Sequence, residues 1–324
     1  MAAVATRHTG PMALDEIDRR IVGALQVDGR ASWRRIAGVI DVPVRTVVRR
    51  GNALLESGDI RVAVVRMTRT VLLEVQAAAA DVDAVARALA DRPTSIFVYV
   101  LGSPMRILVE ELAPEANADL MLHDIPAIPG VTGVALIPVL EYYRTLTSWM
   151  PGQLTAGEAQ QLNPGFGSPP QIDQPMTALD TEDEAILAVL DADARAAAID
   201  IASEIGMSES AVRRRLGVLI GGAVEVRAIV APATLGLPIA AFVWLRVRPA
   251  AVAAVSAALQ ASPYVRYAAF TLSDEQILVD VAAPTVTELR RFLTESPWSA
   301  EVDGMRAASV VAAHKRSGVR VQED

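Results

Sequence analysis

A repeat constrains this chain more than any other feature. Residues 42–54 and 207–219 start 165 positions apart (207 against 42) and share one layout. In the later copy, Val212, Leu216 and Leu219 recur at the spacing of one helical face. Arg213 and Arg214 then point away from that face, and Ser208 precedes it as a helix cap. Each copy is therefore expected to be a helix with an apolar back and a basic front.

Two shorter helices are predicted before each copy. In the first half, Leu14–Asp18 opens one helix with an aspartate cap, and a second runs roughly from Ser32 to Ile40. The matching positions lie at the same offset in the second half: Asp15, Asp18, Ile21, Leu25, Asp28, Arg30, Ile36, Ala37 and Ile40 correspond to Asp180, Asp183, Ile186, Leu190, Asp193, Arg195, Ile201, Ala202 and Ile205. This order is the helix-turn-helix layout, found twice in register.

The basic helix faces suggest DNA recognition. Arginine neutralises phosphates and can grip guanine, and Ser and Thr reach base edges or backbone oxygens. The alternative is an ordinary solvated basic face, because such faces are common. The repeat and its context favour DNA, and the expected contacts are Arg45, Thr46, Arg49, Arg50 and Asn52 in the first unit and Ser208, Ser210, Arg213, Arg214 and Arg215 in the second.

A βαββαβ pattern follows each helix-turn-helix unit. In the first half the expected elements are strands 62–65 and 71–75, helix 77–90, strands 95–101 and 106–110, helix 115–124 and strand 133–140. In the second they are strand 240–247, helix 249–260, strands 264–272 and 276–281, helix 285–294 and strand 304–312. The predicted fold class is α+β, with two winged helix-turn-helix units alternating with two ferredoxin-like βαββαβ domains.

These patterns divide the chain into seven segments. They are a flexible tail at 1–13, helix-turn-helix units at 14–66 and 179–231, βαββαβ domains at 67–141 and 232–313, a Pro- and Gly-rich linker at 142–178 and a tail at 314–324. The first tail lacks the apolar core of a signal peptide. The linker is expected to be a flexible coil that is long enough for the two halves to meet.

The motifs resemble those of the Lrp/AsnC family, the feast/famine transcription regulators. The resemblance is carried by Leu179–Asp180, Asp183, Asp193–Arg195 and 208–219, with Arg215 at the centre of the last stretch. The first copy departs from the family at Gly51, where a bulky apolar residue is usual, and at Pro43, which replaces the usual Ser cap. Members normally carry one such unit and one regulatory RAM-type βαββαβ domain. This chain resembles two whole members fused.

The resemblance implies double-stranded DNA as one partner and a small effector, often an amino acid, as another. In relatives the effector binds between protomers, near the turn between the second and third strands of the regulatory domain. The matching turns are 102–105 and 273–276, which keep the family's Gly-Asp pattern in part. The candidate effector residues are Gly102, Ser103, Met105, Ser273 and Asp274. The alternative is that these are two ordinary hairpin turns.

Charge and composition exclude several other classes. Net charge is −8; residues 14–66 carry +3 and residues 179–231 carry −5, so the second unit has the fuller motif and the less favourable charge. Cysteine is absent, which excludes disulfides and thiolate sites. His8, His123 and His314 show no metal-ligand spacing. We therefore expect no metal, no cofactor and no catalysis.

The uncharged run 228–245 could be mistaken for a membrane span, but Pro232, Gly236 and Pro238 argue against one long helix. We expect no membrane association and a cytoplasmic protein. Two other functions remain open. Sirohaem decarboxylases resemble this fold, although 242–245, the nearest match to their histidine- and aromatic-rich strand, has no histidine. The chain could also be a ligand sensor with degenerate heads.

Two structural expectations complete the hypothesis. Gly51 should leave a gap where Leu216 fills its own core, which would make the first head the less stable. Strands 97–100 and 242–245 are apolar on both faces, so one face can pack on helices and the other on a second sheet. We expect an intramolecular pseudo-dimer with two unlike heads reading an asymmetric site, and higher homo-oligomers built from such chains.

Overall fold

The computed structural model of the chain describes residues 14–58, 60–67, 69–112, 118–167 and 179–321. The tail expected at 1–13, the end of the expected linker from 168, the start of the helix expected at 115 and the last three residues lie outside this range.

Both helix-turn-helix units, called heads from here on, are confirmed. Their helices are α1 (Glu16–Val27), α2 (Trp33–Ile40) and α3 (Val44–Glu56) in the first head and α6 (Thr181–Ala192), α7 (Ala198–Ile205) and α8 (Glu209–Leu219) in the second. The expected caps are present, because the side chains of Asp15, Asp180 and Ser208 each accept a backbone N–H three residues on. Pro43 begins α3 with no side-chain cap.

The predicted order of strands and helices is confirmed in both regulatory domains. The first contains β2 (Thr70–Ala77), α4 (Val82–Asp91), β3 (Ser95–Leu101), β4 (Arg106–Leu112), the π-helical turn η1 (Leu120–Asp124) and β5 (Val131–Arg144). The second contains β7 (Ile239–Val247), η4 (Pro249–Ala251), α9 (Val252–Ala261), β8 (Val265–Thr271), β9 (Ile277–Ala283), α10 (Val286–Glu295), η5 (Ser299–Glu301) and β10 (Val302–Arg316).

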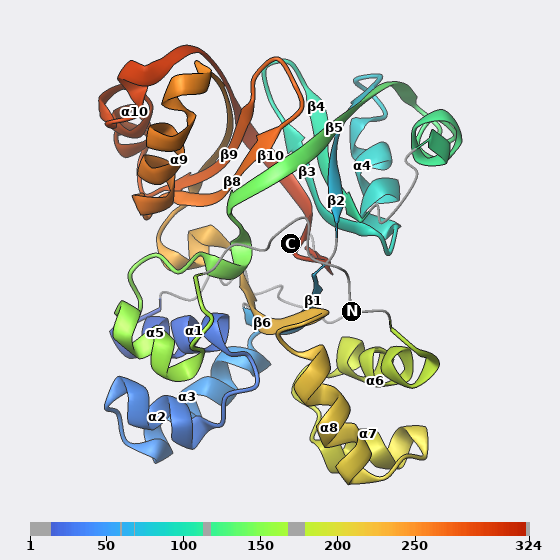
Figure 1. Cartoon of the computed structure of the whole chain (residues 1–324), viewed down its shortest axis with the longest axis vertical. Helices are drawn as coiled ribbons and strands as arrows, with labels where there is room; N and C mark the ends of the chain where they lie inside the picture. Colours follow the sequence, from blue (N-terminus) through green and yellow to red (C-terminus); the bar gives the residue numbers. More distant parts are fainter. Residues whose placement is uncertain (1–13, 59, 68, 113–117, 168–178, 322–324) are drawn as a thin grey trace, which may run out of the picture.

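The two domains close into one barrel. Apart from the short β11 (Val319–Arg320), the strands of the nine-stranded sheet run β10-β3-β4-β2-β5-β8-β9-β7, and β7 pairs back to β10. The two seams between the halves are β5 with β8, where Val139 faces Thr271, and β10 with β3, where Val310 faces Leu101. The last long strand of each half is thus shared with the other half, as Figure 1 shows above the two heads.

The barrel interior joins aromatic residues from both halves. The ring centroids of Tyr99 and Phe242 lie 5.3 Å apart, and those of Phe97 and Phe242 lie 6.0 Å apart. The opposite faces of the same strands pack on helices, Val98 beside α4 and Val243 beside α9. The expected burial of both strand faces is therefore present, and the halves pair within one chain.

The heads are joined to each other beneath the barrel. Strand β1 (Ile60–Arg66) of the first head pairs antiparallel with β6 (Val224–Val230) of the second in a separate two-stranded ribbon. The uncharged run 228–245 becomes the end of β6, the short helix η3 (Pro232–Leu235) and the start of β7. Within the described residues, the chain has no helix long and apolar enough to cross a membrane.

The linker and the C-terminal boundary differ from prediction. Strand β5 continues to Arg144, and the expected coil contains η2 (Leu146–Ser148) and helix α5 (Ala156–Leu162), which Thr155 and Glu158 cap reciprocally. Ala159 and Leu162 of α5, with Trp149 and Leu154 before it, join the core of the first head. The expected tail from 314 is instead the end of β10, because that strand must reach across to β3.

The expected gap at Gly51 is also absent. A Cβ on Gly51 would lie 2.5 Å from the Trp33 ring, so that ring occupies the space. In the second head, Ala198 matches Trp33 and Leu216 matches Gly51, so the small and the large residue have changed places. The expectation that the first head is the less stable loses its physical basis, since its core is filled by Trp33 and covered by α5.

Because the large and small residues at these two positions are interchanged between the heads, we predict that substitutions at Trp33 and Gly51 are coupled. Gly51→Leu should lower the free energy of unfolding by about 1–3 kcal/mol, because the new side chain collides with Trp33. Trp33→Ala together with Gly51→Leu recreates the layout of the second head, so urea denaturation should show a smaller loss than the sum of the single losses. Gly217→Leu is the control, because a Cβ at Gly217 has nothing within 4 Å. If the loss of unfolding free energy in the double variant equals the sum of the two single losses, the two side chains do not share one space.

Candidate nucleic-acid interface

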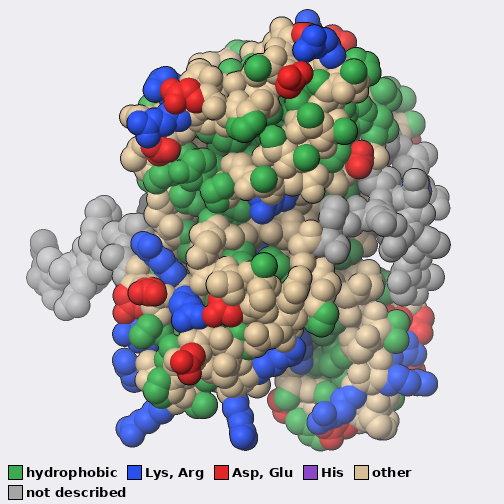
Figure 2. Space-filling view, turned by 60° about the vertical axis from the view of Figure 1, so that its left-hand side comes forward, with side chains coloured by type: hydrophobic (Ala, Val, Ile, Leu, Met, Phe, Trp, Pro, Cys, Tyr) green, Lys and Arg blue, Asp and Glu red, His purple; other side chains and the backbone are tan. Residues whose placement is uncertain are grey.

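The third helix of each head presents basic side chains to solvent. Arg45 and Arg49 on α3 are exposed, as is Arg214 on α8, and none of the three has an ion pair or hydrogen bond within the described residues. Arg213 is exposed but donates to Glu209 one turn earlier, 2.9 Å from Nε. Figure 2 shows basic side chains projecting from the lower end of the molecule, where the heads lie. This surface has free guanidinium groups that can meet phosphates.

The other predicted contacts with exposed hydroxyl or amide groups also lie along these helices. Asn52 and Ser210 are exposed, and Thr46 is half-buried. Ser208 caps α8 through the N–H of Ala211, and its Oγ lies 3.2 Å from that of Ser210. Their role at DNA stays a prediction.

Arg50 and Arg215, whose side chains are 25% and 21% exposed, are engaged by carboxylates of their own heads, and their assignment to the DNA surface stays a prediction. Arg50 donates to Asp15 at 2.6 Å and to Asp18 at 2.8 Å. Arg215 donates to Asp180 at 2.9 Å, to Asp183 at 2.7 Å, and also to Glu182. Each arginine therefore ties the third helix of its head to the start of the first helix.

The electrostatics agree with this structural role. The hydrogen bonds that Arg50 donates to the carboxylates of Asp18 and Asp15 raise the pKa of Arg50. The pKa of Asp15 is lowered, first by the backbone N–H of Asp18 and then by Arg50. Asp183 raises the pKa of Arg215 in the same way. These carboxylates also sit at a helix N-terminus, where negative charge is favourable.

A reciprocal pair of arginines holds the heads together, a contact that the sequence analysis did not predict. Arg30 donates to the carbonyls of Ala194 at 2.6 Å and Ala196 at 2.7 Å. Arg195 donates to the carbonyl of Ala31 at 3.0 Å and also to that of Gly29. We call Arg30 and Arg195 the arginine clamp. The two residues occupy matching positions of the repeat, so the contact is isologous.

Further contacts reinforce the arginine clamp. The guanidinium of Arg195 lies 4.6 Å from the centroid of the Trp33 ring of the first head. Arg66 at the end of β1 approaches Glu184 and Asp191 of α6 at 3.5 Å and 3.6 Å. The spacing between α3 and α8, the third helices of the two heads, therefore depends on contacts between the heads as well as on the barrel.

The two turns expected to bind an effector lie at strand ends of the barrel. Gly102 donates its N–H to the carbonyl of Ser309 in the other half at 3.0 Å, while Ser103 and Met105 are exposed. Ser273 donates to the carbonyl of Glu275 within its own turn at 2.6 Å, and Asp274 is exposed. The structure thus places the first turn at a seam between the halves, and effector binding there stays a prediction.

Charged groups from both halves meet at this end of the barrel. Glu74 accepts from Arg106 at 2.6 Å and from Arg306 at 2.8 Å. The guanidinium of Arg306 lies 3.7 Å from the centroid of the Trp244 ring. These ion pairs cross the pseudo-dimer, because Glu74 and Arg106 belong to one half and Arg306 and Trp244 to the other.

A buried carboxylate lies in the barrel wall between the halves. Glu110 accepts hydrogen bonds from Thr70 at 2.9 Å and from Tyr267 at 3.2 Å. Burial raises its pKa to about 7, although these hydroxyl groups oppose the shift. Glu110 lines a cavity of about 70 Å³ together with Tyr142, Leu146 and Ser317.

Comparison with known proteins identifies the family. The model of the AsnC-type helix-turn-helix domain matches residues 14–55 and 179–219. An uncharacterized HTH-type transcriptional regulator of Pyrococcus abyssi is 32% identical over 144 residues, which cover 43% of this chain and 90% of the relative. The chain belongs to the Lrp/AsnC family. HTH-type transcriptional regulator FL11 of the same organism is 32% identical over 148 residues, 42% of this chain and 95% of the relative. One such Lrp/AsnC relative therefore corresponds to less than half of this chain.

One solved structure shares the architecture of the whole chain. It is the siroheme decarboxylase NirDL, with a TM-score of 0.60, 12% sequence identity and 93% of each chain covered. A likeness at this identity shows a common fold and leaves the activity open. The fold of this chain is thus arranged like that of a siroheme decarboxylase.

An experiment can distinguish the arginine on α3 that is paired with carboxylates, Arg50, from an exposed and unpaired one, Arg49. Arg50→Ala should lower the free energy of unfolding, because it leaves Asp15 and Asp18 without their cation. Arg49→Ala should leave stability unchanged and flatten the salt dependence of DNA binding by about one unit. Urea denaturation and binding titrations at several salt concentrations measure both. A flattened salt dependence for Arg50→Ala, without loss of stability, would show that Arg50 contacts DNA instead.

Glu110 should make stability depend on pH. Its pKa is about 7 in the fold against an ordinary 4.5, so ionisation is harder in the folded state. Stability from this group is therefore full below about pH 4.5 and falls as pH rises towards 7, by at most about 3 kcal/mol. Glu110→Gln should be more stable than the parent at pH 8, and the difference should vanish near pH 4.5. Glu141→Gln, at an exposed carboxyl on β5, is the control. A constant difference would contradict the assignment.

Proposed function

We propose that the chain is a transcription regulator whose two unlike heads read one asymmetric DNA site. The observation that carries this proposal is the pair of third helices, held at a set spacing on one side of the molecule with Arg45, Arg49 and Arg214 exposed and unpaired within the described residues. In the proposed mode of binding, the two third helices enter successive major grooves, about one helical turn apart.

The first head contributes more of the electrostatic affinity. Two of the three unpaired arginines lie on α3, and residues 14–66 carry +3 against −5 for residues 179–231. On α8, Arg213 is engaged by Glu209 and Arg215 by the acidic start of α6. Since phosphate neutralisation drives non-specific affinity, the second head adds base selection through Arg214, Ser208 and Ser210.

A small effector, such as an amino acid, acts at the barrel. The turn containing Gly102, Ser103 and Met105 lies at a seam between the halves, and the opposite turn contains Ser273 and Asp274. A ligand that bridged the halves there would bias the barrel, and the heads would follow through the β1–β6 ribbon. The pseudo-dimer formed by one chain is then the unit from which higher homo-oligomers are built.

The regulator is favoured over a decarboxylase. NirDL shares the fold, and in one structure it is in complex with an iron-uroporphyrin III analogue. The unpaired arginines of the recognition helices have a purpose in a DNA-binding protein, whereas an enzyme of this fold gives them none. Titration of this protein with iron-uroporphyrin, followed by visible absorption, should leave the free-pigment spectrum unchanged. A saturable band shift would favour the enzyme.

Footprinting on the promoter next to its own gene tests the proposal. We expect a protected asymmetric site with two half-sites about one helical turn apart.

Inserting about five base pairs between the two half-sites should weaken binding strongly, because it rotates one half-site to the opposite side of the duplex. The double variant Arg30→Ala/Arg195→Ala should suffer less from this insertion, since the heads lose the arginine clamp. The single variant Arg246→Ala, at an exposed position on β7, is the control. Equal penalties in all proteins would contradict the role of the arginine clamp, and no protected site would contradict the proposed function.

A further inference from the structure

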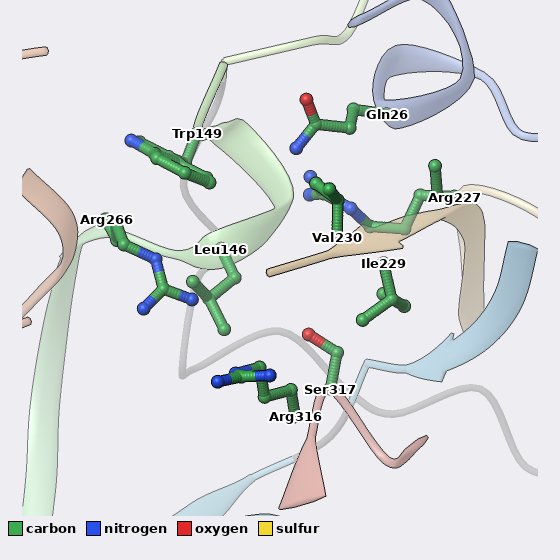
Figure 3. Close-up of a pocket in the computed structure, with 10 residues that line it drawn as sticks. Gln26, Leu146, Trp149, Arg227, Ile229, Val230, Arg266, Arg316 and Ser317 are labelled. Atoms are coloured by element: carbon green, nitrogen blue, oxygen red, sulfur yellow. The ribbon is translucent and has the colours of Figure 1, made fainter. Parts of the chain in front are cut away.

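A second cavity lies where both heads meet the barrel. Its enclosed part is small, about 20 Å³, and the whole hollow, with the space that is open to solvent, is about 290 Å³. Five elements contribute to its wall: α1 through Gln26, β6 through Arg227, η2 and the residue after it through Leu146 and Trp149, β8 through Arg266, and the end of β10 through Arg316. Figure 3 shows the three guanidinium groups and the amide of Gln26 arranged around one space, with Leu146 between them.

Several polar atoms in this wall are buried without a partner. Arg227 is 3% exposed, and its Nη1 has no hydrogen bond; Gln26 is also 3% exposed, and its Oε1 has none. Within the described part of the chain, the Nε atoms of Arg266 and Arg316 are equally unsatisfied. Unpaired buried donors are costly and rare in folded proteins. Three of these four atoms are guanidinium donors, and their convergence on one cavity indicates a ligand that accepts hydrogen bonds, whereas Gln26 Oε1 is itself an acceptor.

The charges of the wall require an anion. Asp280 neutralises Arg266 at 3.0 Å. Glu225 is the acidic neighbour of Arg227 along β6, and burial raises the pKa of Glu225. With both carboxylates ionised, the three guanidinium groups still leave one positive charge in excess. Burial also lowers the pKa of Arg227 to about 10, although Glu225 opposes this shift.

The repeat has a second, equivalent place, where β1 lies near β3 as β6 lies near β8, and this place lacks the arginine cluster. Ile96 stands at the β3 position that corresponds to Arg266 on β8. Neither Val62 nor Ala63, the residues at the matching point of β1, carries a charge. The arginine cluster is therefore a property of one junction and not a consequence of the repeat.

We propose that this cavity binds the oxyanion group, carboxylate or phosphate, of a small metabolite. Guanidinium groups recognise both oxyanions through paired, charge-assisted hydrogen bonds. The rest of the molecule extends past Leu146 and Ser317, which this cavity shares with the apolar cavity beside Glu110. The site is separate from the two turns discussed above and does not depend on DNA binding.

The position of the site gives the ligand a structural consequence. It touches α1 of the first head, β6 of the second head and the ends of two barrel strands, so an occupied cavity ties all three parts together. Because the ligand replaces missing partners of buried arginines, it stabilises the closed junction more than an open one. Hydrogen exchange in 224–230 reports this closure directly.

Binding of inorganic phosphate and of acetate to the free full-length protein tests the proposal. Isothermal titration at constant ionic strength, with chloride as the balancing ion, should show one saturable site for at least one of the two anions. Thermal unfolding should shift upwards with the same concentration dependence, and exchange in 224–230 should slow. Saturation by phosphate alone or by acetate alone identifies the preferred oxyanion.

Two substitutions assign the site. Arg227→Gln and Arg316→Gln should each weaken binding at least tenfold, while Arg246→Gln, at an exposed arginine on β7, should bind as the parent does. Arg316 is only half-buried, so its variant keeps the test valid if Arg227→Gln fails to fold. The absence of a saturable site for either anion, or equal binding by Arg316→Gln and the parent, overturns the proposal. Neither result bears on DNA binding.

Discussion

The exchange of the strands β5 and β10 between the halves is the constraint on which the other contacts depend. Each βαββαβ domain leaves one sheet face uncovered by its own helices, and that face carries Phe97 and Tyr99 in one half and Phe242 and Trp244 in the other. Burying these aromatic rings against each other requires both domains. Because one chain supplies both, closure of the barrel needs no second molecule and proceeds at a high effective concentration. The placement of both heads follows from this closure.

Duplication supplied the symmetry, and substitutions at matching positions removed it. The core of one head uses Trp33 above Gly51, and the other uses Ala198 below Leu216. Both arrangements fill a similar space, so the fold tolerated a compensating change of size. On the outer surfaces no such compensation is required. Charge, caps and recognition residues could therefore diverge freely, so the heads are unlike on the surfaces that would meet DNA, while their cores stay filled to a similar extent.

Sequence periodicity predicted most of the elements, because apolar spacing directly reports the buried face of a helix or strand. Periodicity could not predict which side chains contact each other in the fold. Arg50 and Arg215 lie beside Arg49 and Arg214 in sequence, yet one of each pair turns inwards to carboxylates of another helix, and only the fold shows which. The ring of Trp33 in the expected gap was missed for the same reason. Helix α5 was hidden because seven residues in a Pro- and Gly-rich stretch carry almost no periodic signal.

The heads meet through two kinds of contact that differ in how firmly they hold. The arginine clamp brings two cations into one half-buried place, and burial lowers the pKa of both Arg30 and Arg195, helped at Arg195 by repulsion from Arg30. Asp28 and Asp193 oppose this effect only in part. The desolvation of two like charges therefore offsets much of the gain from their hydrogen bonds to carbonyls. The β1–β6 ribbon has no such cost, since its seven-residue strands pair backbone to backbone. The ribbon thus sets the distance between the heads, and the clamp, with its fixed geometry and small net energy, sets their relative orientation.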